Sequence, residues 1–256
     1  MHLTVLGSSA SYAGPGQACS GYLVEHNGTR VLFDCGPGVL ANLAQVTDPT
    51  TLDAVFITHN HPDHICDIYA LQALLRYAPE GPAAPLELWT PPELFERLAC
   101  LLSERGAREL CEAFDEHDLS ACAPVAVGSL LVTPHPVVHT DPTFALVAEA
   151  DGLRLCYTAD TVPGAAVLSA ARDCDLLLAE ATLPRQYAGR APHLTAAEAG
   201  ALATDAGAGE LVLTHIWPTN DRDQMAREAI ELFRGRVRVA SEFDVFEVVK
   251  AAERNS

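Results

Sequence analysis

Lysine is almost absent from this chain of 256 residues. Lys250 is the single lysine, and 16 lysine and arginine residues stand against 34 acidic ones, so the formal net charge is −18 at pH 7. Proteins that bind long nucleic acids need a basic surface, because lysine and arginine neutralise the backbone phosphates. The composition therefore argues against long RNA or DNA as a partner, but it is compatible with a small anionic substrate.

Long apolar segments are absent too. No apolar run approaches the ~20 residues that a membrane-spanning helix needs, and no basic region precedes an apolar segment at the N-terminus. We therefore expect a cytoplasmic protein without a membrane partner. The cysteines show no Cys-x-x-Cys spacing and are interpreted as small buried apolar residues in a reducing compartment. They are Cys19, Cys35, Cys66, Cys100, Cys111, Cys122, Cys156 and Cys174.

Histidine and aspartate are concentrated in one short segment. Residues 58–64 read Thr-His-Asn-His-Pro-Asp-His, which places four metal-binding side chains in the spacing His-x-His-x-Asp-His. The apolar run at residues 53–57 predicts a buried strand before this segment, and the apolar spacing at residues 65–75 predicts a helix after it. Imidazole and carboxylate are ligands that zinc, iron and manganese accept readily. The segment therefore predicts a metal site on a strand-to-helix turn.

Three further ligand candidates each follow a strand-like apolar run. His139 follows residues 130–138, Asp160 follows residues 153–159, and His215 follows residues 211–214. Sites in α/β sheets gather at the carboxyl ends of strands, so we expect these side chains to converge on the first segment. Seven ligands are enough for two metals, each with an open position for water, which is typical of a catalytic site. The expected division is His59, His61 and His139 on one metal, Asp63, His64 and His215 on the other, and Asp160 between them.

The pattern along the chain predicts an α/β fold with a single domain over residues 1–256. With 49% hydrophobic residues, a chain of this length can bury a full core. Strands alternate with helices in both halves, which predicts a four-layer αββα sandwich. Thr195 and Glu198 have the spacing of a capping box at the start of an alanine-rich helix. The expected helices cover residues 37–46, 65–75, 91–102, 107–117, 164–171, 195–206 and 221–233.

These motifs resemble those of the metallo-β-lactamase-fold hydrolases. The residue 59–64 signature, His139, Asp160 and His215 are similar to the two-metal ligand set of that superfamily, and Asp34 is similar to its early Asp-x-Gly motif. The sequences Glu-Ala-Thr at 180–182 and His-Leu-Thr at 193–195 resemble elements of the RNase Z-like phosphodiesterase branch. Within that branch, the segments at 20–23, 193–200 and 213–216 resemble actinobacterial proteins described as atypical cyclic-nucleotide phosphodiesterases.

The expected chemistry follows from the ligand set and from this resemblance. Two metals about 3.5–4 Å apart can bind a bridging hydroxide and steady the attacking and leaving oxygens. Asp63 would bind a metal and accept a hydrogen bond from that hydroxide, and Asp34 would orient a ligand imidazole. His193 lies outside the ligand set, so it is the candidate general acid, with Glu180 holding its ring. Zinc is the expected metal, and manganese or iron would suit the same ligands.

Several functions fit these residues. The first hypothesis is a two-metal hydrolase of a small phosphodiester, such as 3′,5′-cyclic AMP. The second is RNase Z-like maturation of transfer-RNA 3′ ends, but only 21 positions separate His139 from Asp160, too few for the long arm with which bacterial RNase Z enzymes grip transfer RNA. The third is a lactonase, thioesterase or β-lactamase-like carbonyl hydrolase, and the fourth is a metal-bound sensor without turnover. A homodimer is compatible with all of them.

Anion contacts are expected between Glu180 and His193. Arg185 and Arg190 are the nearest basic residues in sequence, and a phosphodiester needs such partners. Ser8, Ser9 and Ser20 are the alternatives.

Overall fold

A computed structural model describes residues 1–79, 81–140 and 142–250. Within these residues the strands form two seven-stranded sheets. The first has the order β14 (Val245–Glu247), β1 (His2–Gly7), β2 (Gly21–His26), β3 (Thr29–Phe33), β4 (Ala54–Phe56), β5 (Leu86–Thr90) and β6 (Phe114–Asp118). The second has the order β13 (Arg236–Val239), β12 (Glu210–Thr214), β11 (Leu176–Glu180), β10 (Leu153–Tyr157), β9 (Thr143–Ala150), β8 (Leu130–Val137) and β7 (Val125–Val127).

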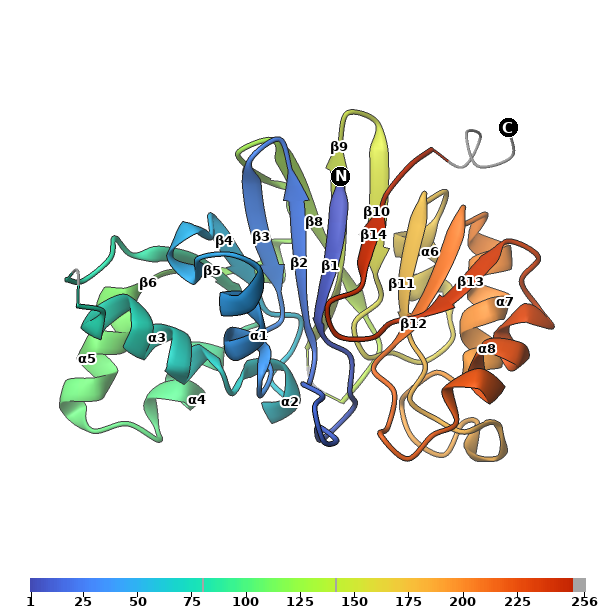
Figure 1. Ribbon diagram of the computed structural model, residues 1–256, viewed down its shortest axis with the longest axis horizontal. Helices are drawn as coiled ribbons and strands as arrows, with labels where there is room; N and C mark the ends of the chain where they lie inside the picture. The colour runs from blue at the N-terminus through green and yellow to red at the C-terminus, as the bar shows by residue number, and fades with distance from the viewer. Residues whose placement is uncertain (80, 141, 251–256) are drawn as a thin grey trace.

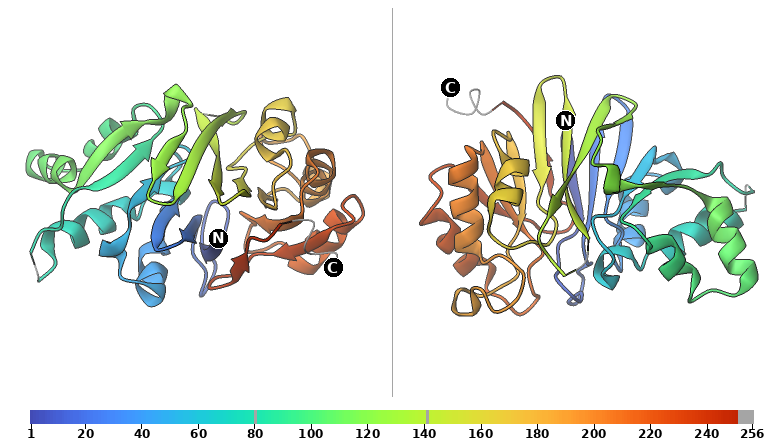
Figure 2. Two further views of the ribbon diagram at one scale, coloured as in Figure 1. Left: turned by 90° about the horizontal axis from the view of Figure 1, so that it is seen from above. Right: turned by 180° about the vertical axis from the view of Figure 1, so that it is seen from behind.

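Helices cover the outer face of each sheet. The first sheet is flanked by α1 (Val39–Val46), α2 (Pro62–Ile65), α3 (Ile68–Tyr77), α4 (Leu94–Ala99) and α5 (Glu104–Ala113). The second is flanked by α6 (Ala165–Ala171), α7 (Ala196–Ala206) and α8 (Arg222–Ile230). Figures 1 and 2 show these two helical groups at opposite ends of the molecule with the strands between them. The predicted four-layer αββα sandwich is confirmed. No helix in the described ranges is long and apolar enough to cross a membrane.

Alternation along the strands divides the apolar residues between layers. On β3, Val31 and Phe33 pack between the two sheets, whereas Leu32 packs against the helices that cover the first sheet. Successive side chains of a strand point to opposite faces, so one strand supplies two cores. The same division on β11 sends Leu176 and Leu178 to the inter-sheet core and Leu177 to the helices.

The predicted acidic helix at residues 107–117 is wrong at its C-terminal end. Helix α5 ends at Ala113, and the next five residues form β6, which pairs in parallel with the edge of β5. Pairing there satisfies backbone groups that the β5 edge would otherwise expose to solvent. It also stacks His117 on Trp89, with ring centroids 4.4 Å apart. Tertiary pairing therefore overrides the local helical pattern.

Two smaller expectations can be checked directly. The capping box is confirmed, because Thr195 Oγ1 accepts from the N–H of Glu198 while the Glu198 carboxylate accepts from the N–H of Thr195.

The eight cysteines are all free. The expectation that they are buried is wrong for Cys100 and Cys111, which are exposed.

Several strands end at one edge of the sandwich. Strands β1, β3, β4 and β5 run in the same direction in the first sheet, and β8, β10, β11 and β12 do so in the second. The loops that follow them meet at the lower edge of the molecule in Figure 1, around α2. This edge carries the histidines and carboxylates that the sequence singles out.

Candidate metal centre

The segment at residues 59–64 begins just after β4 and runs directly into α2. Pro62 is the first residue of this short helix, where its fixed φ and missing N–H are tolerated. The N–H of His64 donates to the carbonyl of His61 at 3.0 Å, and the N–H of Cys35 donates to the carbonyl of His64 at 2.7 Å. These bonds tie the segment to the chain that follows β3, which keeps its side chains at fixed positions.

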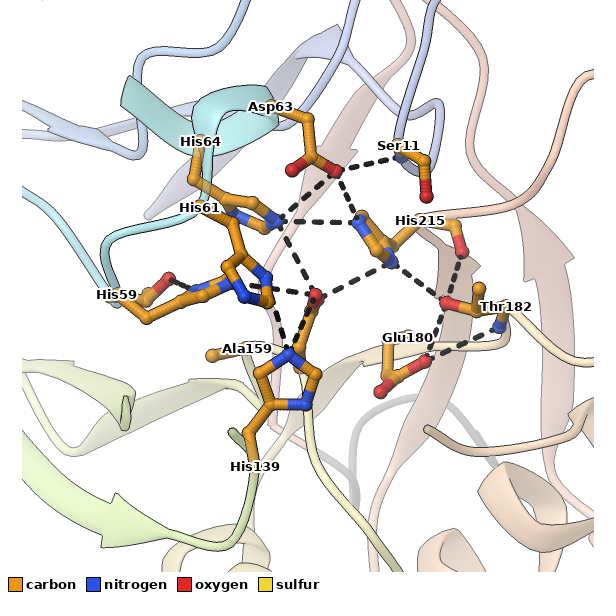
Figure 3. Close-up of polar contacts among 12 residues, drawn as sticks. Ser11, His59, His61, Asp63, His64, His139, Ala159, Glu180, Thr182 and His215 are labelled. Carbon is orange, nitrogen blue, oxygen red and sulfur yellow. Dashed lines mark hydrogen bonds and ion pairs between the residues drawn. The ribbon is translucent and has the colours of Figure 1, made fainter. Parts of the chain in front are cut away.

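All seven side chains predicted as metal ligands lie together. Figure 3 shows the five histidines of this set and Asp63 close to one another. The potential ligand atoms of each of two groups lie within 4.8 Å of one another. The first group is His59, His61, His139 and Asp160, and the second is Asp63, His64 and His215. Asp160 lies between the groups, because its Oδ2 is 3.5 Å from Nε2 of both His59 and His64. The structure brings the seven side chains together, and their division between two cations stays a prediction.

Two buried atoms in this cluster have no hydrogen-bond partner. They are Nε2 of His59 and Oδ1 of Asp160, and both side chains are almost completely buried. Buried polar atoms in folded proteins are nearly always paired, so this pair of unsatisfied atoms needs an explanation. A cation supplies it, because imidazole nitrogen and carboxylate oxygen are ligands that zinc, manganese and iron accept. The cluster is therefore able to bind metal.

Asp34 fixes the position of residues around the cluster through hydrogen bonds. Its carboxylate is fully buried and accepts from Nδ1 of His64 at 2.7 Å, from the N–H of Thr58 at 2.8 Å and from the hydroxyl of Tyr157 at 3.0 Å. The Thr58 hydroxyl, 3.0 Å from Nδ1 of His59, also donates to it. With Nδ1 of His64 engaged in this way, Nε2 faces the other ligands. The structure thus places Asp34 where it orients the imidazole of His64.

Other histidines are oriented by similar contacts. Nδ1 of His139 donates to the carbonyl of Pro192 at 2.8 Å, and Nδ1 of His215 lies 2.7 Å from the hydroxyl of Thr182. His61 is the exception, because it turns Nδ1 rather than Nε2 toward the cluster, 3.3 Å from Nε2 of His139. Partners on the outer nitrogen fix the ring orientation and the tautomer of metal-binding histidines.

Burial and neighbouring charges set the protonation of the cluster. Burial, with a further contribution from the charge of His64, lowers the pKa of His59 to about 4. Burial also lowers the pKa of His139. For Asp160 burial acts in the opposite direction, but the surrounding histidines outweigh it and hold the pKa of this carboxyl well below its usual range. Near neutral pH, the cluster therefore presents unprotonated His59 and His139 and an ionised Asp160.

Three residues that follow strand ends near the cluster adopt a left-handed backbone. Asp34, Ala159 and His215 have φ angles of 58°, 53° and 49°. Each such residue costs roughly 1–3 kcal/mol unless it is glycine, and such residues persist where the surroundings hold them. All three follow the ends of β3, β10 and β12, where a sharp change of direction turns the chain into the site.

Glu180 and His193 form a pair beside the metal-binding groups. Glu180, the last residue of β11, is fully buried and accepts from the N–H of Thr161 at 2.7 Å and from Nδ1 of His193 at 3.0 Å. The same Nδ1 is 3.9 Å from Oδ2 of Asp160. Burial disfavours the imidazolium of His193, but the hydrogen bond and charge of Glu180 outweigh this effect, so its pKa is raised. The structure brings together the two residues that the sequence predicts as a pair.

Some contacts at the site carry no sequence signal. The backbone N–H of Ser11 donates to Oδ2 of Asp63 at 2.7 Å (Figure 3), and the Pro192 carbonyl holds His139. Backbone atoms are common to all residues, so only their position identifies them. The glycine- and serine-rich composition of residues 8–16 indicates a loop there but not its contact.

The two arginines expected to bind an anion have other partners. Arg185 forms an ion pair with Glu231 at 2.9 Å, and the guanidinium of Arg190 lies over the ring of Tyr187, 5.4 Å from its centroid. Both side chains lie on the loop between Glu180 and His193, so the structure leaves their role as anion contacts a prediction.

Comparison with known proteins decides the family. A family model described as a beta-lactamase superfamily domain matches residues 29–216, which include all seven candidate ligands. The chain belongs to the metallo-β-lactamase superfamily. It is a metallo-hydrolase of this fold, with ribonuclease Z among its relatives.

Three matches place the chain within the superfamily. An uncharacterized protein of Mycobacterium tuberculosis is 34% identical, with 98% of this chain and 93% of the relative covered. Ribonuclease Z of Myxococcus xanthus is 30% identical, with 97% of each chain covered. That alignment spans 303 positions against the 256 residues of this chain, so the relative contains segments that this chain lacks. The crystal structure of the metallo-beta-lactamase fold protein YhfI from Bacillus subtilis superposes with a TM-score of 0.86 at 28% identity, covering 96% of this chain and 99% of that one.

Proposed function

We propose that this superfamily member is a two-metal phosphodiesterase that cleaves a small phosphodiester, with a 3′,5′-cyclic nucleotide such as cyclic AMP as its substrate. The observation that carries the proposal is the pairing of Glu180 with His193 at 3.0 Å beside the metal-binding groups. His193 is not one of the seven expected ligands, although a ring nitrogen of His193 also lies within 4.8 Å of ligand atoms of Asp160 and His215. Because Glu180 engages Nδ1 of His193, we assign this histidine as a proton donor. The pair also lies in the two segments, residues 180–182 and 193–195, that resemble elements of the RNase Z-like branch.

The ligand side chains would hold two cations. His59, His61 and His139 would bind one, Asp63, His64 and His215 the other, and Asp160 would contribute an oxygen to each. Zinc is the proposed metal, because the donor set is rich in imidazole, although manganese and iron accept the same ligands. Bound cations would lower the pKa of a water molecule and polarise the phosphodiester.

The protein residues would supply proton transfer and orientation. Asp63 is held by the N–H of Ser11 and by Nε2 of His215, 3.2 Å away, so its carboxylate is positioned to accept a hydrogen bond from the attacking water. Glu180 engages Nδ1 of His193 and leaves Nε2 as the nitrogen that donates a proton to the leaving oxygen. Phosphodiester cleavage expels an alkoxide, which is strongly basic and needs this proton. A thioester expels a thiolate, which needs it much less.

Two features favour a small substrate over transfer RNA. The segment between His139 and Asp160 is occupied by the β9–β10 hairpin, whose paired strands are joined by the Asp151-Gly152 turn. This hairpin leaves no room for a long arm between His139 and Asp160. The net charge of −18 also disfavours a long polyanion. We propose a cytoplasmic location for this protein, which suits a cyclic-nucleotide substrate. Formation of a homodimer stays a prediction, and no interface is assigned to it.

A substrate panel on metal-loaded protein tests the proposal. Cyclic AMP and bis-para-nitrophenyl phosphate should be cleaved, while a lactone, a thioester and a precursor transfer RNA should be turned over much more slowly. His193→Ala and Glu180→Gln should lose turnover at unchanged metal content. His2→Ala, which removes an exposed histidine at the far end of β1, should behave like the wild type. Preferred cleavage of the lactone or of transfer RNA would refute the proposal.

A further inference from the structure

The loop after β1 is fastened beside the metal-binding groups. The N–H of Ala10 donates to the carbonyl of Ile216 at 3.2 Å, and the N–H of Ile216 donates to the carbonyl of Ser8 at 2.9 Å. The loop is thereby joined to the chain next to His215. Its next residue, Ser11, donates its backbone N–H to Oδ2 of Asp63 (Figure 3). The loop and the segment after β12 consequently form one wall of the site.

Trp217 lies in this wall. It follows His215 by two residues, and its indole Nε1 donates to the hydroxyl of Ser11 at 3.4 Å. Two hydrogen bonds through Ser11 thus connect the indole to Asp63. The bond to Ser11 holds the edge of the indole, while the side chain stays partly exposed. Tyr12, the neighbour of Ser11, is 52% exposed. Trp217 therefore has accessible surface beside the loop residue that holds Asp63.

The other tryptophan is placed differently. Trp89 packs between Phe56 and His117, with ring centroids 5.8 Å and 4.4 Å from its own, so its faces are covered. The chain has two tryptophans and its aromatic content is only 6%. Both tryptophans are partly exposed, but only the indole of Trp217 is bonded to Ser11 in the wall of the site.

We propose that Trp217 stacks the base of a nucleotide substrate while the phosphodiester lies over the metal-binding groups; this inference rests on the proposed function. A nucleobase is flat and uncharged, so an aromatic ring can bind it without the cations that this acidic chain lacks. Loss of such stacking weakens binding roughly 10- to 100-fold. Because the base is remote from the reacting phosphorus, the loss falls on KM rather than on kcat.

Kinetics of three variants separate stacking from a purely structural role. With the metal-loaded enzyme, Trp217→Ala should raise KM for cyclic AMP roughly 10- to 100-fold and leave turnover of base-free ribose 3′,5′-cyclic phosphate unchanged. Trp217→Phe keeps a ring without the N–H, and Ser11→Ala keeps the indole without its anchor, so both should change KM only slightly. Tyr77→Ala, which removes an exposed tyrosine on α3, is the matched control and should have no effect.

Fluorescence gives a readout independent of turnover. Trp89→Phe leaves Trp217 as the single tryptophan, and AMP should quench its emission in the metal-loaded protein whereas ribose 5-phosphate should not. Absence of quenching by AMP overturns the inference. An unchanged KM for cyclic AMP in Trp217→Ala also overturns the inference. It is overturned as well if Trp217→Phe and Ser11→Ala lose turnover equally on cyclic AMP and on base-free ribose 3′,5′-cyclic phosphate, because Trp217 would then only hold the loop. If the wild type does not cleave cyclic AMP, the proposed function fails, and the inference fails with it.

Discussion

Replacing Asp34 by asparagine tests how the cluster is held. The carboxylate is fully buried and accepts from four donors, which belong to His64, Thr58 and Tyr157. An asparagine of the same shape keeps one acceptor oxygen and turns an NH₂ group toward donors that it cannot satisfy. It also removes the negative charge opposite Nδ1 of His64. The substitution should therefore weaken both metal binding and the fold.

The magnitude follows from these contacts. Loss of a partner that orients a metal-binding histidine typically costs 10- to 100-fold in metal affinity, which is about 1.4–2.8 kcal/mol. Each buried donor left without an acceptor costs about 1–3 kcal/mol. With two donors facing the new NH₂ group, the free energy of unfolding of the metal-free Asp34→Asn protein should fall by about 2–6 kcal/mol. Competition with a chelating dye measures the first effect, and chemical denaturation of metal-free protein measures the second.

Tyr157→Phe is the matched control. It removes one of the four donors but keeps the carboxylate and its contact with His64, so it should lower stability by about 1 kcal/mol and change metal affinity much less than Asp34→Asn. If Asp34→Asn bound zinc as tightly as the wild type, Asp34 would not orient His64 in the manner described.

Three further predictions concern catalysis, the metal and the fold. Glu180→Gln and His193→Ala should each lower kcat for a phosphodiester by about 10²–10⁴-fold, since general acid catalysis contributes that much. Steady-state kinetics at verified metal content would measure this loss of kcat. A substrate with an activated leaving group, such as para-nitrophenolate, should show a smaller loss. Removal of metal by a chelator should abolish turnover and lower Tm, because a ligand that binds only the folded state stabilises it; calorimetry with zinc or manganese added back should show recovery. Thr195→Ala should lower the free energy of unfolding by about 0.5–2 kcal/mol through loss of the α7 capping box, whereas Thr195→Ser should retain it.

Much of the site is encoded in short stretches of sequence. The spacing at residues 59–64 places four ligands on one turn, and no distant contact is needed to recognise them. The convergence of His139, Asp160 and His215 on that turn follows from their positions after apolar strands, whose ends meet at one edge of a sandwich. The capping box at Thr195 is local in the same sense, because its partners are three residues apart.

Other features depend on residues that are far apart in the chain. The pairing of Ser11 with Asp63 and of His139 with the Pro192 carbonyl involves backbone atoms that no side-chain pattern marks. The course of residues 114–118 is a further case, because the edge of β5 was available to pair with them.

The amino-acid sequence by itself determined which side chains can bind metal, the layered α/β fold that brings them together and the net charge of −18. Only the tertiary structure decided how each ligand is oriented, where the Glu180–His193 pair lies and which loops form the wall of the site. The reason is physical. Ligand type and periodicity are properties of neighbouring residues, whereas orientation depends on hydrogen bonds that form only after the two sheets have packed.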